Sequence, residues 1–111
     1  MDRFESGLTL DEPGRLVVSL SGELDLAAAD ALWNDLEPLF TGERTLVLDG
    51  TGLEFLDSGG LRVLARAAKL AAQTGVALRL VAPNPVVQRT LTLAGAEKLI
   101  ELRDSVAEAL A

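Results

Sequence analysis

Residues 45–75 read TLVLDGTGLEFLDSGGLRVLARAAKLAAQTG, and two different periodicities follow one another within this stretch. The apolar run 46–48 does not alternate with polar residues, which is typical of a short strand between two covering layers. Residues 50–52, Gly-Thr-Gly, predict a loop after this strand. A helix is then predicted, ending at Gly75 as a left-handed cap. Its apolar face recurs at helical spacing and comprises Leu61, Leu64, Ala65, Ala68 and Ala72.

The residues before this stretch predict a hairpin and a first helix. Residues 8–10 and 16–20 alternate as strands do, and a Pro-Gly pair between them favours a tight turn. Helical spacing follows over residues 26–40, with Asp25 as the expected N-cap. Trp33 falls at the border between the apolar and polar faces of that helix, so the pattern leaves its burial open.

The residues after it continue the alternation of strands and helices. A strand is predicted at 76–80, and Asn84 followed by Pro favours a helix over 85–94. Residues 99–102 predict a short edge strand, and the Asp-Ser pair 104–105 offers a cap for a last helix. This order is typical of an α/β domain whose parallel or mixed sheet is covered by helices.

The composition excludes several classes of protein. A length of 111 residues fits one domain, 1–111, and the 49% of hydrophobic residues argue against disorder. The absence of Cys and His removes disulfides, thiolate metal sites and Ser-His or Cys-His nucleophilic pairs. The formal net charge of −7 repels a nucleic acid backbone. No leader peptide or apolar span is recognisable, so we expect a cytoplasmic protein that does not insert into a membrane.

Four carboxylates raise the hypothesis of a small enzyme. Glu23 and Asp25 stand at a strand-to-helix junction, and Asp49 and Asp57 follow the next strand. General acid–base catalysis needs one carboxylate of a pair to be desolvated or crowded, and magnesium needs several oxygen ligands. The sequence indicates neither, and it contains no Walker-type phosphate loop. We therefore favour capping and solvated loop ends over catalysis, and expect no metal and no cofactor.

The segment 55–62, FLDSGGLR, places a hydroxyl and two glycines at the start of a helix. Asp57 or Ser58 is able to accept hydrogen bonds from the first backbone N–H groups of that helix. Gly59 and Gly60 permit another molecule to approach the backbone closely. One interpretation is an ordinary cap with a tight turn. The other is a surface that docks a partner at the positive end of the helix.

The predicted exposed side of the same helix is basic. Arg62, Arg66 and Lys69 recur at i, i+4 and i+7. A basic stripe on an acidic protein would steer an acidic partner, whereas the simpler interpretation is a solvated helix face.

Three segments resemble the signatures of one known family. They are GELD at 22–25, FLDSGGL at 55–61, and 84–95, which begins NPVV and ends LAG. Their order and spacing are similar to those of STAS-domain anti-sigma factor antagonists, over nearly the whole chain. The resemblance implies one compact STAS-like domain with a mixed sheet of about four or five strands and about four surrounding helices.

The resemblance also implies a partner and a switch. The partner is an anti-sigma factor, typically a serine kinase of the histidine-kinase-like ATPase fold. The unmodified antagonist captures it and frees a sigma factor, and the kinase reverses this by phosphorylating a serine where the second helix begins. Together, the pattern and the resemblance indicate these partner-binding residues: Glu23, Asp25, Asp57, Ser58, Gly59, Gly60, Leu61, Arg62 and Arg66.

The sequence departs from the family at the phosphoacceptor. The family has a hydroxyl residue where this chain has Gly59, and Ser58 corresponds to the residue before the acceptor. We favour an antagonist that stays in the unphosphorylated state. Two alternatives are that Ser58 serves as a displaced acceptor, or that the domain is an accessory subunit of a lipid-transport ABC system.

Overall fold

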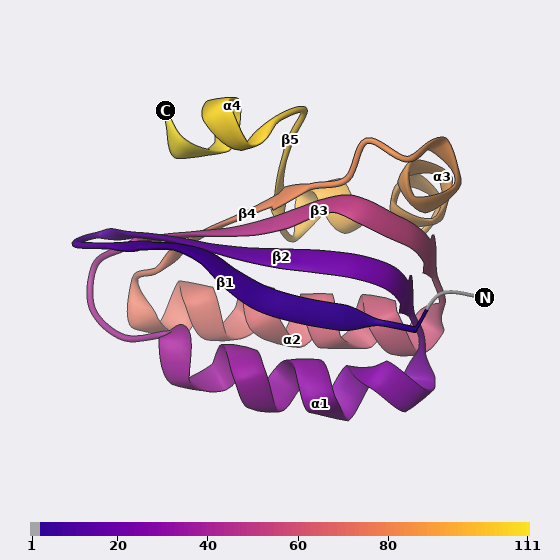
Figure 1. Cartoon of the computed structure of the whole chain (residues 1–111), viewed down its shortest axis with the longest axis horizontal. Helices are drawn as coiled ribbons and strands as arrows, with labels where there is room; N and C mark the ends of the chain where they lie inside the picture. The colour runs from indigo at the N-terminus through magenta and orange to yellow at the C-terminus, as the bar shows by residue number, and fades with distance from the viewer. Residues whose placement is uncertain (1–2) are drawn as a thin grey trace.

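A mixed sheet runs through the centre of the computed structural model, which describes residues 3–111 (Figure 1). Its strands are β1 (Glu5–Glu12), β2 (Arg15–Leu24), β3 (Thr45–Leu56), β4 (Ala77–Val81) and β5 (Glu101–Arg103). They lie in sequence order, with β1 antiparallel to β2 and each later pair parallel. The prediction of an α/β domain with a mixed sheet is confirmed.

Helices follow each parallel strand, and most begin at a predicted cap. They are α1 (Leu26–Leu36), α2 (Ser58–Thr74), α3 (Pro85–Leu93) and α4 (Val106–Leu110), with short 3-10 turns η1 (Glu37–Leu39) and η2 (Ala96–Lys98). The side chains of Asp25, Asn84 and Ser105 accept hydrogen bonds from backbone N–H groups at the starts of α1, α3 and α4. Gly75 ends α2 with a φ of 80°. Within residues 3–111, no helix has the length and apolar character needed to cross a bilayer.

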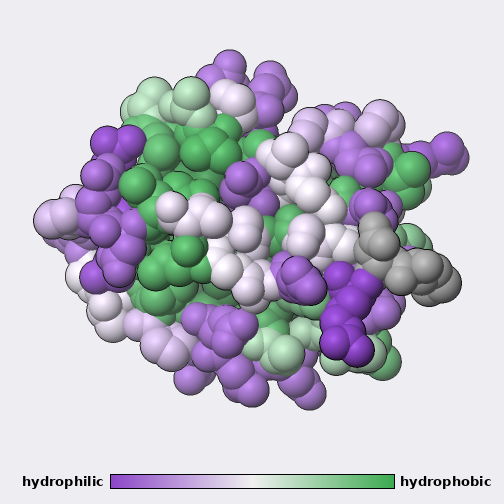
Figure 2. All heavy atoms as spheres, in the orientation of Figure 1, coloured by the Kyte–Doolittle hydropathy of each residue, from purple (hydrophilic) through white to green (hydrophobic). Residues whose placement is uncertain are grey.

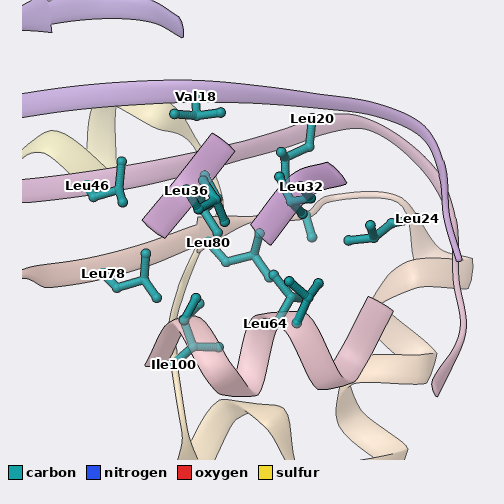
Figure 3. Close-up of a cluster of buried hydrophobic side chains, with 14 of the residues drawn as sticks. Val18, Leu20, Leu24, Leu32, Leu36, Leu46, Leu64, Leu78, Leu80 and Ile100 are labelled. Atoms are coloured by element: carbon teal, nitrogen blue, oxygen red, sulfur yellow. The ribbon is translucent and has the colours of Figure 1, made fainter. Parts of the chain in front are cut away.

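The main core lies between the sheet and helices α1 and α2, which cover the same face (Figure 1). Leu16, Val18 and Leu20 of β2 point into this core, and Figure 3 shows leucines of β3, β4, α1 and α2 converging on it. Val17 and Val47 face the opposite side, where they pack with α4. Figure 2 shows hydrophobic residues gathered toward the left of the molecule in the region of α4. The predicted division of β2 into two faces is confirmed.

Residues 50–52 do not form a loop, so this prediction is wrong. Strand β3 continues through them and stays paired with β2, with an irregularity in register. A Cβ on Gly50 would lie 2.6 Å from the carbonyl oxygen of Val81, and one on Gly52 would lie 2.9 Å from the Cβ of Ser21. The glycines therefore serve close packing within the sheet rather than a turn.

The buried face of α2 is rotated from the predicted one. Ala65 and Ala72 are exposed, because Gly60 is pressed against the ends of β2 and β3 and fixes the rotation of the helix. Ala94, at the end of the predicted helix 85–94, follows α3 as its C-cap and is likewise exposed. The residues of α2 that are buried are Gly59, Gly60, Val63, Leu64, Ala67 and Ala71.

Candidate functional site

Helices α1, α2 and α3 begin near the end of the sheet where the parallel strands before them finish (Figure 1). Backbone N–H groups are unpaired at a helix start and carry partial positive charge, so this edge of an α/β sheet is a common binding surface. We call the residues around these three starts the helix-entry surface. Its exposed and half-buried residues are Glu23, Asp25, Leu26, Phe55, Asp57, Ser58, Leu61, Arg62, Asn84, Pro85 and Val86.

Asp57 joins the starts of two helices. Its Oδ1 accepts a hydrogen bond from the backbone N–H of Gly60 at 3.0 Å, which caps α2. Its Oδ2 accepts one from the backbone N–H of Leu26 at 3.2 Å, at the first residue of α1. The carboxylate thereby stabilises two positively polarised helix ends at once. Of the two predicted caps for α2, the structure thus assigns the role to Asp57 and leaves Ser58 exposed.

Gly59 and Gly60 lie beneath this surface and are buried. A Cβ on Gly59 would meet the backbone of Leu26, with its Cα at 2.6 Å. A Cβ on Gly60 would meet the carbonyl oxygen of Leu24 and, at 2.5 Å, the Cδ1 of Leu56. The prediction that another molecule approaches these glycines is therefore wrong, because residues of the same chain pack against them. The two glycines contribute to the helix-entry surface only by allowing this close packing beneath it.

The basic side chains of α2 are exposed, as predicted. The guanidinium of Arg66 lies over the ring of Trp33 in α1, 4.0 Å from its centroid, which is a cation–π geometry. Trp33 is buried, and its Nε1–H donates a hydrogen bond to Glu37 Oε2 at 3.2 Å. Arg66 is thus held across the two helices, while Arg62 lies one turn closer to the helix-entry surface.

Glu23 and Asp25 line a hollow beside the first turns of α1. This hollow has a volume of about 450 Å³ and is also bordered by Arg3, Phe4 and alanines of α1. A smaller hollow of about 100 Å³ lies between α1 and α2, and its lining includes Gly59, Arg62 and Arg66. The structure therefore distributes the predicted partner-binding residues over both sides of the start of α1.

The sequence analysis did not predict that three large apolar side chains are exposed on the helix-entry surface. Leu26 is 68% exposed, Phe55 is 40% exposed and Val86 is 59% exposed. Each stands near a predicted cap, where helical and strand periodicity give no indication of burial. Apolar groups beside exposed polar groups are typical of protein-binding surfaces.

The carboxylates considered for catalysis do not assemble. Asp25 and Asp57 are occupied as caps, and Asp49 lies within β3, where its Oδ1 accepts hydrogen bonds from the N–H and Oγ1 of Thr51 at 3.1 and 2.6 Å. In the part of the chain that the structure describes, no three Asp or Glu residues come together in a group able to hold a metal ion. The capping interpretation therefore holds for Asp25 and Asp57, whereas Glu23 lies within β2 and Asp49 lies within β3 rather than after it.

Comparison with known proteins places the chain in a family. The STAS domain model matches residues 9–109. The chain is 35% identical over 101 residues to the anti-sigma-F factor antagonist RsfB of Mycobacterium tuberculosis. This alignment covers 90% of this chain and 82% of RsfB. The structure resembles that of an anti-sigma factor antagonist from Mycobacterium paratuberculosis, with a TM-score of 0.84, 33% identity, and coverage of 97% and 92%. It also resembles the anti-sigma factor antagonist SpoIIAA in its unphosphorylated form, with a TM-score of 0.70, 25% identity, and coverage of 96% and 92%. The chain belongs to the STAS domain family.

Proposed function

We propose that this protein is an anti-sigma factor antagonist, which captures an anti-sigma factor on the helix-entry surface and acts by binding rather than by catalysis. The observation that carries the proposal is the exposure of Leu26, Phe55 and Ser58 at or near two helix starts that the carboxylate of Asp57 joins. Such a surface offers polar groups, apolar contact area and a positive helix dipole to a partner. The names of the relatives support an anti-sigma factor as that partner.

We propose that the partner is a serine kinase of the histidine-kinase-like ATPase fold and that the two proteins bind each other in the cytoplasm. We also propose that residues 1–111 act together as one STAS domain. In support, β1 extends the sheet at one end of the chain, and α4 packs on the sheet at the other. Residues 1 and 2 lie outside the described part of the structure.

The antagonist remains permanently competent to bind, because residue 59 cannot carry a phosphate. Gly59 has no hydroxyl, and it is buried beneath the backbone of Leu26. A phosphoryl group adds about −1.5 to −2 charges, and without it the polarity of the helix-entry surface does not change. Ser58 is the exposed hydroxyl nearest to this position, so it is the residue on which the proposal is tested.

The test uses the anti-sigma factor kinase encoded in the same genome, with calorimetry to measure affinity. We expect a complex whose affinity is unchanged after incubation with ATP in place of ADP, and no phosphate on the protein by mass spectrometry. Ser58→Ala is the matched control for phosphorylation at this residue, and its affinity is expected to be equally insensitive to the exchange of ADP for ATP. Absence of a complex would refute the antagonist role, whereas phosphorylation of Ser58 with loss of binding would refute only the permanent competence.

The role of a lipid-transport accessory subunit receives less support. The relatives compared above are named as anti-sigma factor antagonists. The helix-entry surface has no feature that favours a transporter over an anti-sigma factor.

A further inference from the structure

A second apolar surface lies on the molecule away from the caps. It is a groove between α2 and the segment that joins α3 to β5, with a volume of about 250 Å³. We call it the α2–η2 groove. Its lining is apolar except for one arginine and consists of Leu61, Arg62, Leu64, Ala65, Ala94, Ala96, Leu99 and Ile100.

The rim of this groove exposes more apolar surface than the fold requires. Leu99, which lines the groove, is 62% exposed, and Leu93, which precedes the lining residue Ala94 in sequence, is 78% exposed, whereas Leu91, Ala96 and Ile100 are buried in the core. Among residues 3–111, no element of the chain covers Leu93 or Leu99. Exposed large apolar side chains that lie beside an apolar groove mark a place where another molecule docks.

One base, Arg62, lines the groove and other bases lie on the exposed side of α2, and this charge indicates the chemistry of the bound molecule. Helix α2 contains no acidic residue and carries exposed Arg62, Arg66 and Lys69, although the whole chain has a formal net charge of −7. Lys98 adds a fourth base beside Leu99, next to a single acid, Glu97. The ion pairs among the described residues involve Arg15, Arg79 and Arg103, and none involves a base of α2. Arg62 and Lys69 are therefore available to carboxylates of a partner.

We propose that the α2–η2 groove binds an acidic amphipathic helix of a partner protein. A large apolar side chain of that helix enters between Leu64 and Leu99, and its acidic residues face Arg62, which lines the groove, and Lys98 beside Leu99. This is the helix-in-groove mode, in which apolar anchors supply contact area and complementary charge sets the orientation. The groove shares Leu61 and Arg62 with the helix-entry surface, so a partner bound at the helix starts is able to extend onto it. The proposal goes beyond the antagonist role and does not depend on it.

The test is a titration of the full chain, labelled with ¹⁵N, against a synthetic peptide followed by NMR. The probe is a peptide of about 18 residues, long enough to form a helix, with Leu at i, i+3, i+4 and i+7 and Glu at most other positions. We expect amide shifts confined to residues 61–69 and 93–100. The same peptide with Lys in place of Glu is expected to bind at least roughly tenfold more weakly.

Two variants and one control locate the contact. Leu99→Gln and Arg62→Glu are each expected to weaken binding roughly tenfold or more, and both residues are exposed, so the fold is retained. Leu8→Gln changes an equally large side chain that is 50% exposed on β1, and it is expected to bind as the unaltered chain does. Three outcomes would overturn the proposal: no shifts in the groove, equal binding of the lysine peptide, or unchanged binding by Leu99→Gln.

A basic and apolar surface also fits an anionic membrane, so a vesicle assay separates the two partners. The chain is mixed with phosphatidylglycerol vesicles and floated on a density gradient. We expect it to stay at the bottom of the gradient. Flotation that Leu99→Gln abolishes would overturn the proposal of a protein partner in favour of a lipid surface.

Discussion

Gly59 and Leu26 are in direct backbone contact. A Cβ at residue 59 would lie 2.6 Å from the Cα of Leu26 and 2.9 Å from its nitrogen. These neighbours are main-chain atoms, so a change of side-chain rotamer cannot relieve the clash. The start of α1 therefore rests on the start of α2, and the missing side chain at residue 59 sets the distance between the two helices at the helix-entry surface.

Replacing Gly59 with serine tests this contact. Gly59→Ser forces α1 away from α2, and we expect overpacking to lower the free energy of unfolding by about 1–3 kcal/mol. Ser58→Ala is the control, because residue 58 is exposed and its loss is expected to change stability by less than about 0.5 kcal/mol. Urea denaturation measures both. Equal midpoints for Gly59→Ser and the unaltered chain would show that α1 does not rest on residue 59.

Removing the carboxylate of Asp57 is expected to weaken two helix starts together. Asp57→Ala loses the hydrogen bonds to the N–H groups of Gly60 and Leu26, and we expect a loss of about 1–2 kcal/mol of stability. Asp25→Ala is the matched comparison, because Asp25 caps α1 alone through the N–H of Ala28. Denaturant midpoints are expected to fall further for Asp57→Ala than for Asp25→Ala. The reverse order would argue against the bridging role of Asp57.

Much of the fold was predictable because local chemistry and tertiary packing agree. The caps at Asp25 and Asn84, and the left-handed Gly75, depend only on neighbouring backbone groups, and all three are present in the structure. The division of β2 into two faces follows from the alternation of side chains along a strand. These features need no knowledge of distant residues.

The sequence predictions are wrong where the environment of a residue is set by residues that are distant in the sequence. Gly50 predicts a turn from its own propensity, but the carbonyl of Val81 in the adjacent strand requires a glycine there. The rotation of α2 depends on Gly60 packing against the ends of two strands, which the spacing of leucines and alanines does not reveal. For the same reason, the contact between Gly59 and Leu26 and the exposure of Phe55 were inaccessible from the sequence.

The exposed apolar residues of the helix-entry surface are expected to contribute to capture of the anti-sigma factor. Leu26→Gln and Phe55→Gln are each expected to weaken the complex by about 1 kcal/mol or more, since each removes apolar contact area. The unfolding free energy of Leu26→Gln is expected to change little, because this side chain is 68% exposed, whereas Phe55→Gln also removes a partly covered ring and is expected to lower stability as well. Calorimetric titration with the anti-sigma factor measures the effect, with Leu8→Gln on β1 as the control. Unchanged affinity in both variants would place the docking contacts elsewhere.

The contact between Arg66 and Trp33 is open to a spectroscopic test, because the chain contains one tryptophan. Arg66→Ala uncovers the indole face, so we expect its fluorescence to shift to longer wavelength and the stability to fall by about 0.5–1 kcal/mol. Arg66→Lys retains a cation but not the planar group, and an intermediate shift is expected. Lys69→Ala removes an exposed base of the same helix that does not line the hollow beside Trp33, and it is expected to leave the emission unchanged. A shift of equal size in Lys69→Ala would mean that the emission follows the charge of α2 rather than the stacked guanidinium.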